Sequence, residues 1–177
     1  MNTRRQRQIE ELANKILQEA KIHEPAVKVD QIAEAHSITI TDFDLGVDVS
    51  GVLVLKEGKA TIGLNPNNHP VRRRFTIAHE LGHFFLEHQR GGLFVDNHKK
   101  NFAVLYRDAQ SSTGEILQEQ EANAFAAALL MPKKWLEARI RKFNFDLTDE
   151  TDLQMLARQF EVSSQAMAIR IANLGLF

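Results

Sequence analysis

The stretch Arg74-Phe-Thr-Ile-Ala-His79-Glu80-Leu-Gly-His83-Phe-Phe-Leu-Glu-His88 decides how this sequence is interpreted. Residues four apart lie on the same face of an α-helix, so the imidazoles of His79 and His83 can reach one ion from adjacent turns. Glu80 lies beside them, close enough to accept a proton from water that the ion activates. The spacing therefore predicts a zinc site with Glu80 as the general base of a hydrolytic reaction.

The surroundings of the motif favour this interpretation over a chance match. The residues around the two histidines are mostly apolar: Phe75, Ile77, Ala78, Leu81, Phe84, Phe85 and Leu86. An imidazole without a partner is costly to bury in such a stretch, which favours a ligand role. The alternative is a pair of satisfied core histidines without a metal.

A catalytic zinc site usually has three protein ligands and one open position. The chain contains no cysteine, so the third ligand must be another histidine or a carboxylate. In the helix expected at residues 114–130, Glu119 shares a face with a stripe of small residues, whereas Glu121 points about 200° away. We predict Glu119 as the third ligand and Asn123 as the residue that holds a ligand imidazole through its distal ring N–H. The alternative is a solvated Glu119.

Helical patterns account for the segments before the motif. Apolar residues at helical spacing predict an amphipathic helix over residues 4–21, and Asp30 is a candidate cap for a second helix that runs to His36. The motif helix is expected to begin at Pro70, after a turn-rich segment, and to stop at Gly91-Gly92.

Alternating and β-rich segments predict a small antiparallel sheet. Ile38–Phe43 alternates like a strand, and Val52–Leu55 and Ala60–Leu64 flank a turn in which Gly58 can supply a positive φ. If Ala60–Leu64 is an edge strand near the motif helix, an extended peptide could pair with it. An Ile62→Pro variant would then lose cleavage while its zinc content stays intact.

The C-terminal segment from Thr148 to Phe177 predicts two helices joined by a short turn at Glu161-Val-Ser-Ser. This arrangement superficially resembles a helix-turn-helix that reads DNA. Its second helix carries Gln165 and Arg170 but little other positive charge, which disfavours direct nucleic-acid binding. We expect these helices to pack on the core or to engage a protein partner.

Composition limits the remaining possibilities. A chain of 177 residues with 44% apolar residues and a net charge of −1 is typical of one soluble domain without a global attraction to nucleic acid or membranes. We expect a single domain over 1–177, with a catalytic core at 1–131 and a helical subregion at 132–177. The charged N-terminus and the lack of about 18 consecutive apolar residues favour a cytoplasmic protein.

Two blocks of sequence together resemble the ImmA/IrrE family of bacterial metallopeptidases. They are Arg74–His83, quoted above, and Glu119-Gln-Glu-Ala-Asn-Ala-Phe-Ala-Ala-Ala-Leu-Leu-Met-Pro132. Weaker similarity at Tyr106–Gly114 and Leu156–Ser163 extends the resemblance over roughly residues 50–177. The expected fold is α+β, with the small antiparallel sheet packed on a zincin-like helical core and a helical C-terminal extension.

The resemblance also implies a metal site and a class of substrate. It implies zinc bound by His79, His83 and Glu119, with Glu80 catalytic, in agreement with the spacing. Members of the family cleave or antagonise helix-turn-helix repressors, which are often encoded beside them on mobile elements or prophages. The resemblance is to the short form, without the sensor-like domain of the larger stress regulators. The alternative is a non-proteolytic binding regulator, or a toxin–antitoxin-like partner, that retains the zinc fold.

A few further residues have weaker claims to function. Arg72, Arg73 and Arg74 begin the motif helix, where we expect a solvated face rather than a binding site. His88, His98 and Tyr106 are candidates for stabilising an oxyanion, and the two histidines also for extra ligands, but we expect no catalytic role for most such residues.

Overall fold

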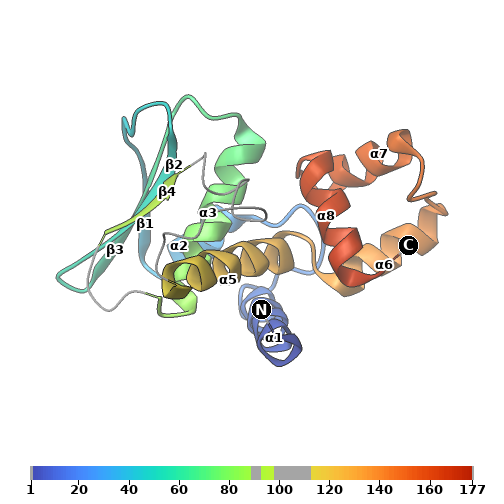
Figure 1. Ribbon diagram of the computed structural model, residues 1–177, viewed down its shortest axis with the longest axis horizontal. Helices are drawn as coiled ribbons and strands as arrows, with labels where there is room; N and C mark the ends of the chain where they lie inside the picture. The colour runs from blue at the N-terminus through green and yellow to red at the C-terminus, as the bar shows by residue number, and fades with distance from the viewer. Residues whose placement is uncertain (1, 89–92, 98–112, 177) are drawn as a thin grey trace.

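A computed structural model describes residues 2–88, 93–97 and 113–176 of the chain (Figure 1). Two of the weaker candidates, His98 and Tyr106, lie outside the described residues. The described chain has an α+β fold, as the sequence predicts, with a small sheet beside helices.

The helices form largely where the apolar spacing predicts them. They are α1 (Thr3–Glu19), α2 (Val29–Ala35), α3 (Pro70–Phe85), α5 (Thr113–Leu130), α6 (Lys133–Phe143), α7 (Glu150–Phe160) and α8 (Ser164–Leu174). Side chains of Asn2 and Ser163 accept hydrogen bonds from the first turns of α1 and α8, which satisfies backbone N–H groups that have no helical partner.

Two predicted helix boundaries are wrong. The cap of α2 is Lys28, and Asp30 instead lies in the first turn, where its negative charge complements the helix dipole. The motif helix ends at Phe85, with Leu86 as its C-cap, rather than at Gly91-Gly92. Glu87 follows with a φ of 54°, a left-handed conformation that ends the helix before any glycine is reached.

The sheet contains four described strands in the order β1-β3-β2-β4. They are β1 (Ile38–Asp42), β2 (Val49–Lys56), β3 (Lys59–Leu64) and β4 (Leu93–Asn97). Strands β2 and β3 form the predicted antiparallel hairpin, and Glu57 and Gly58 in its turn have φ values of 50° and 75°.

The sheet is mixed rather than purely antiparallel, because β1 pairs parallel to β3. Ile62 of β3 is paired with Ile40 on one side and with Leu53 on the other. The prediction that Ala60–Leu64 is an edge strand is therefore wrong, and the outermost described strands are β1 and β4. A substrate peptide cannot pair with β3 while both of its neighbours are in place, so the Ile62→Pro test does not apply.

One face of the sheet packs against the helices. Ile38, Leu53 and Ile62 on this face are almost fully buried, in a core shared with the helices. Figure 1 shows the sheet at one end of the molecule and helices α6 to α8 at the other end; α3 packs on the sheet, and α5 packs on α3. The core therefore continues from the sheet through the two helices that carry the candidate site.

The arginines at the start of α3 hold distant segments together instead of forming the predicted solvated face. All three donate hydrogen bonds to other parts of the fold: Arg72 to Ser50, Arg73 to Asp42 and the Asn65 carbonyl, and Arg74 to the carbonyls of Val27, Phe160 and Glu161. Burial lowers the pKa of Arg74. The prediction failed because it considered only the helix to which these residues belong.

The C-terminal helices are attached to the rest of the fold by a second arginine. The Arg170 side chain is only 3% exposed, donates to the Met131 carbonyl over 3.0 Å and pairs with Glu10 of α1. A buried arginine cannot contact a DNA groove, so one of the two polar groups predicted on α8 has a structural role.

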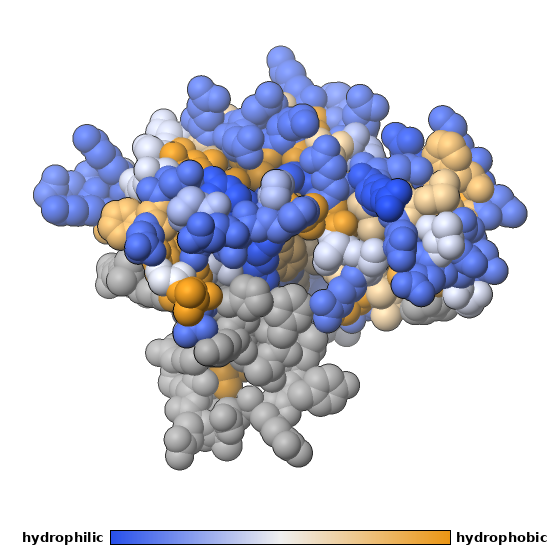
Figure 2. All heavy atoms as spheres, turned by 90° about the horizontal axis from the view of Figure 1, so that it is seen from above, coloured by the Kyte–Doolittle hydropathy of each residue, from blue (hydrophilic) through white to orange (hydrophobic). Residues whose placement is uncertain are grey.

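The described surface is mainly polar. In Figure 2, hydrophilic side chains cover most of the described part of one face, with hydrophobic side chains visible between them. Within the described ranges, we find no helix that is both long enough and apolar enough to span a bilayer.

Candidate metal centre

The site lies where α3 and α5 approach each other closely. A Cβ atom added at Gly82 of α3 would lie 3.0 Å from the Ala122 Cα and 3.2 Å from the Phe125 Cδ1 of α5. The absence of a side chain at Gly82 and the small side chain of Ala122 therefore allow the two helix backbones to come close. This contact carries Glu119, one turn before Asn123, towards the histidines of α3.

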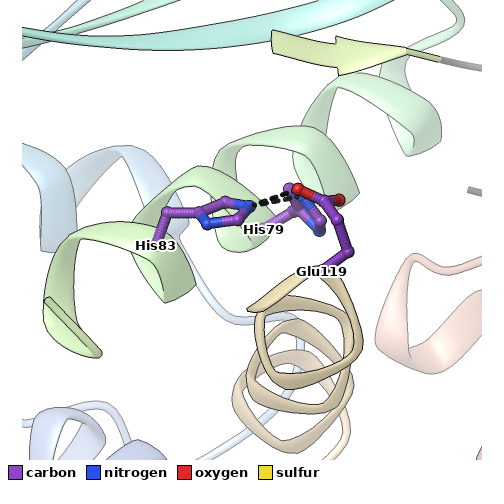
Figure 3. A group of neighbouring side chains, drawn as sticks. All are labelled: His79, His83 and Glu119. Atoms are coloured by element: carbon purple, nitrogen blue, oxygen red, sulfur yellow. Dashed lines mark hydrogen bonds and ion pairs between the residues drawn. The ribbon is translucent and has the colours of Figure 1, made fainter. Parts of the chain in front are cut away.

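Two imidazoles and one carboxylate converge at this contact (Figure 3). The Nε2 atoms of His79 and His83 lie 3.1 Å apart, and they are 3.3 and 3.2 Å from the two carboxylate oxygens of Glu119. Both histidine side chains are 1% exposed and that of Glu119 is 26% exposed. The structure thus brings together the three residues that the helical spacing predicted.

Glu80 comes directly after His79 in α3, and its side chain is fully buried next to strand β2. A Cβ atom added at Gly51 of β2 would collide with the Thr76 Cγ2 and lie 3.6 Å from the Glu80 Oε1. Only glycine lets the strand backbone come this close to the helix. The space around the Glu80 carboxylate is therefore bounded by the strand.

Burial and hydrogen bonding set the protonation of the cluster. Burial lowers the pKa of His83 from 6.5 to about 4, and the attraction of a protonated His83 to Glu119 offsets only part of this effect. Burial by itself would raise the pKa of Glu119, but its contacts with His79 and His83 outweigh burial and lower that pKa below its ordinary value. Near neutral pH the cluster therefore offers a neutral imidazole at His83 and an ionised carboxylate, which are the forms that bind a metal.

Asn123 contacts the far side of the His79 ring. Its Oδ1 lies 3.1 Å from the Nδ1 of His79. An amide oxygen only accepts hydrogen bonds, so the Nδ1 carries the proton and the lone pair of Nε2 faces Glu119. This is the contact expected of a residue that orients an imidazole ligand.

The structure also shows contacts that the sequence did not reveal. His88 does not join the cluster, because its Nδ1 lies 3.1 Å from the Nδ1 of His83, on the side of that ring away from Glu119. Its Nε2 lies 3.0 Å from Glu121, which also accepts hydrogen bonds of 2.7 and 2.6 Å from Arg5. Helical spacing could not find the contacts of Glu121, because they join it to residues 33 and 116 positions away in the sequence.

These outer residues form a compact polar group that contains one ion pair, Arg5 with Glu121. The hydrogen bond from Arg5 lowers the pKa of Glu121, and the same contact raises the pKa of Arg5. Burial lowers the pKa of His88. The His88 and Glu121 side chains are 5% and 8% exposed. Glu121 is therefore an ionised, well-shielded carboxylate behind His83.

The three converging residues fit a zinc ion by their chemistry. Zinc in proteins prefers imidazole nitrogen and carboxylate oxygen when cysteine is absent, and catalytic sites use three such ligands with one position left open. The candidate ligand atoms of His79, His83 and Glu119 all lie within 4.8 Å of one another. The group could hold one metal ion between α3 and α5.

A sheet beside a helix with the His-Glu-x-x-His pattern, completed by a glutamate from a second helix, defines a zincin-like core. The chain belongs to the IrrE N-terminal-like domain family of metallopeptidases, whose model matches residues 33–172. This confirms the membership of the ImmA/IrrE group that the sequence indicated. No curated protein matches the chain.

A solved structure shows the same fold. A Mycobacterium tuberculosis transcriptional regulator superimposes with a TM-score of 0.64 and 19% sequence identity. The alignment covers 94% of this chain and 46% of the regulator, so the chain spans about half of that protein's length. At this identity the similarity concerns the fold alone.

Proposed function

We propose that this protein is a zinc-dependent endopeptidase that hydrolyses a peptide bond in a helix-turn-helix transcriptional repressor and thereby relieves repression. The observation that carries the proposal is the convergence of His79, His83 and Glu119 beside the buried carboxylate of Glu80. Membership of a metallopeptidase family supports the reaction class.

Each residue of the site has a separate role in the proposed reaction. His79, His83 and Glu119 would hold the ion, and Asn123 keeps the His79 ring in the orientation that presents Nε2. The chemistry that zinc supplies in such a site is that of a Lewis acid, which polarises a peptide carbonyl and makes water a better nucleophile near neutral pH. Glu80 accepts the proton from the attacking water and passes it to the leaving amine. Its burial beside β2 keeps this carboxylate in one place.

The proposed substrate rests on different support from the proposed reaction. The similarity of the sequence to the ImmA/IrrE group suggests a repressor as the substrate. A repressor gene next to the gene of this protein would identify the substrate.

The test is incubation of the purified, zinc-loaded protein with that repressor, followed by mass spectrometry of the products. Glu80→Gln removes the proton acceptor while keeping the shape of the side chain. Glu87→Gln is the matched control, because it makes the same chemical change at an exposed position just after α3. We expect one cleavage by the wild type and by Glu87→Gln, and a loss of about 100-fold or more in Glu80→Gln, whose zinc content is unchanged.

Three outcomes would contradict parts of this proposal. Cleavage that persists in Glu80→Gln or in the presence of a chelator would overturn the peptidase mechanism. Repressor inactivation by Glu80→Gln without cleavage would show that the protein acts as a non-proteolytic binding regulator. A salt-dependent shift of DNA by the protein alone would indicate direct nucleic-acid binding.

A further inference from the structure

The proposed function makes no use of the polar group behind the site: His88, Glu121 and Arg5. We propose that His88 and Glu121 are positioning residues that hold the His83 imidazole in its metal-binding orientation, with Arg5 of the N-terminal helix as the last link. The inference rests on the proposed metal role of His83.

The contacts form one continuous path from the site to α1. The Nδ1 of His83 is 3.1 Å from His88, and the Nε2 of His88 is 3.0 Å from the Oε2 of Glu121. The same carboxylate receives two hydrogen bonds from Arg5, so it is held from two sides. The rings of His83 and His88 lie nearly perpendicular, at 74°, with centroids 5.2 Å apart.

The Arg5–Glu121 pair determines which atom donates and which accepts in each of the other hydrogen bonds. The Glu121 carboxylate is paired with Arg5 and offers only acceptors, so the Nε2 of His88 must carry a proton and donate it. The Nδ1 of a neutral His88 then has a lone pair and accepts from the Nδ1–H of His83. As a result, the Nε2 of His83 presents its lone pair towards Glu119. The path therefore selects the tautomer of His83 that a metal requires.

The two imidazoles of the site are held by different means. His79 is oriented by the neutral amide of Asn123, whereas His83 is oriented by a second histidine backed by an ion pair. The matched family segment begins at residue 33, so α1 and its Arg5 lie outside it. In this chain the N-terminal helix thus contributes directly to the support of the site.

Two substitutions of His88 separate the proposed role from simple filling of space. The side-chain oxygen of asparagine reaches the position of the histidine Nδ1, and the terminal amide of glutamine reaches that of Nε2. His88→Asn therefore keeps an acceptor for His83 and loses the donor to Glu121. His88→Gln keeps the donor and loses the acceptor.

The measurement is zinc affinity by competition with a chromophoric chelator, for folded variants checked by circular dichroism. We expect His88→Ala and His88→Gln to weaken zinc binding by about 10- to 100-fold, and His88→Asn to stay within about threefold of the wild type. Glu121→Ala should also weaken binding. The matched control is Glu10→Gln, which breaks the other carboxylate–arginine pair of α1, to Arg170, and should leave zinc affinity unchanged.

Equal affinity of His88→Ala and the wild type, or tighter binding by His88→Gln than by His88→Asn, would overturn the inference. A second measurement needs no variant: nitrogen-15 spectra of the zinc-loaded wild type report which ring nitrogen of each histidine carries a proton. We expect the proton of His88 on Nε2, and a proton on its Nδ1 would contradict the proposed direction. A wild type that binds no zinc would instead refute the proposed function itself.

Discussion

At the scale of single residues, burial and hydrogen bonding act in opposite directions on His83. Burial lowers its pKa to about 4, while the contact with Glu119 acts to raise it. Because burial prevails, the imidazole stays neutral through the ordinary range of pH and remains available to a metal. Protonation of the buried His83 imidazole destabilises the fold only when the metal-free protein is acidified.

This imbalance predicts a specific pH dependence of stability. The unfolded chain takes up a proton on His83 near pH 6.5, whereas the folded chain does so only near pH 4. Proton uptake therefore favours unfolding between these values, and the free energy of unfolding should fall as the pH is lowered through this window. Urea denaturation of the metal-free protein at several pH values measures it. A His83→Asn variant should show a shallower fall, and parallel curves for the two proteins would contradict the prediction.

The sequence predicts the centre of the site better than its surroundings. His79, His83, Glu119 and Asn123 could be chosen from helical periodicity, because each pair lies one turn apart on its own helix. The contact of Glu121 with His88 and Arg5 depends on how three separate segments pack. No local pattern contains that information, although the expected direction of Glu121 away from Glu119 was a partial signal.

At the scale of secondary-structure elements, the close contact of α3 and α5 determines whether Glu119 reaches the histidines. Gly82→Ala would place a methyl group 3.0 Å from the Ala122 Cα and 3.1 Å from its carbonyl oxygen, so α5 must shift. We expect the free energy of unfolding to fall by about 1–3 kcal/mol and the zinc affinity to fall with it.

The matched control for this prediction is Gly114→Ala. An added Cβ at Gly114 meets nothing within 4 Å, so alanine should stabilise α5 by up to about 1 kcal/mol and leave zinc affinity unchanged. Chemical denaturation and chelator competition measure both quantities. Equal zinc affinity in the two variants would show that the close approach is not needed for the site.

The contact between β2 and α3 gives a second prediction. Gly51→Ala would place a methyl group in collision with the Thr76 Cγ2, beside the Glu80 carboxylate. We expect a strong loss of cleavage. Zinc binding should be retained, because the three proposed ligands lie at the contact of α3 with α5 and not at its contact with β2. Thr76→Ser removes the clashing methyl group, so the double variant should recover part of the lost rate. A double variant as inactive as Gly51→Ala would contradict this explanation.

Local patterns predict most elements but not their arrangement. The β2–β3 hairpin follows from its turn residues, and the helices follow from apolar spacing. The parallel pairing of β1 with β3, which places β3 inside the sheet, is a long-range contact without a local signal. The early end of α3 at Phe85 was also missed, because a left-handed glutamate, rather than a glycine, ends the helix.

At the scale of the whole molecule, we propose that residues 1–131 and 132–177 form one cooperative domain. Arg74 links α3 to the end of α7, and Arg170 links α8 to the Met131 carbonyl at the end of α5. Both links involve buried or partly buried arginines, so they are difficult to open one at a time.

Zinc should therefore stabilise both parts together. At a free zinc concentration 100-fold above the Kd, binding adds about 2.7 kcal/mol, which corresponds to a rise in Tm of roughly 5–11 °C for a chain of this size. Trp135, the single tryptophan, lies in α6 and reports the C-terminal helices, while circular dichroism reports all helices. The two transitions should coincide and should shift equally when a chelator removes the metal. A Trp135 transition that ignores the chelator would show that the parts unfold independently.

The central claim is that α3 and α5 together hold one zinc ion, and anomalous diffraction at the zinc absorption edge tests it most directly. We predict one strong peak per chain, about 2.0–2.2 Å from the Nε2 atoms of His79 and His83 and from a carboxylate oxygen of Glu119. No peak in crystals of the zinc-saturated protein, or a peak bound by other residues, would contradict the account.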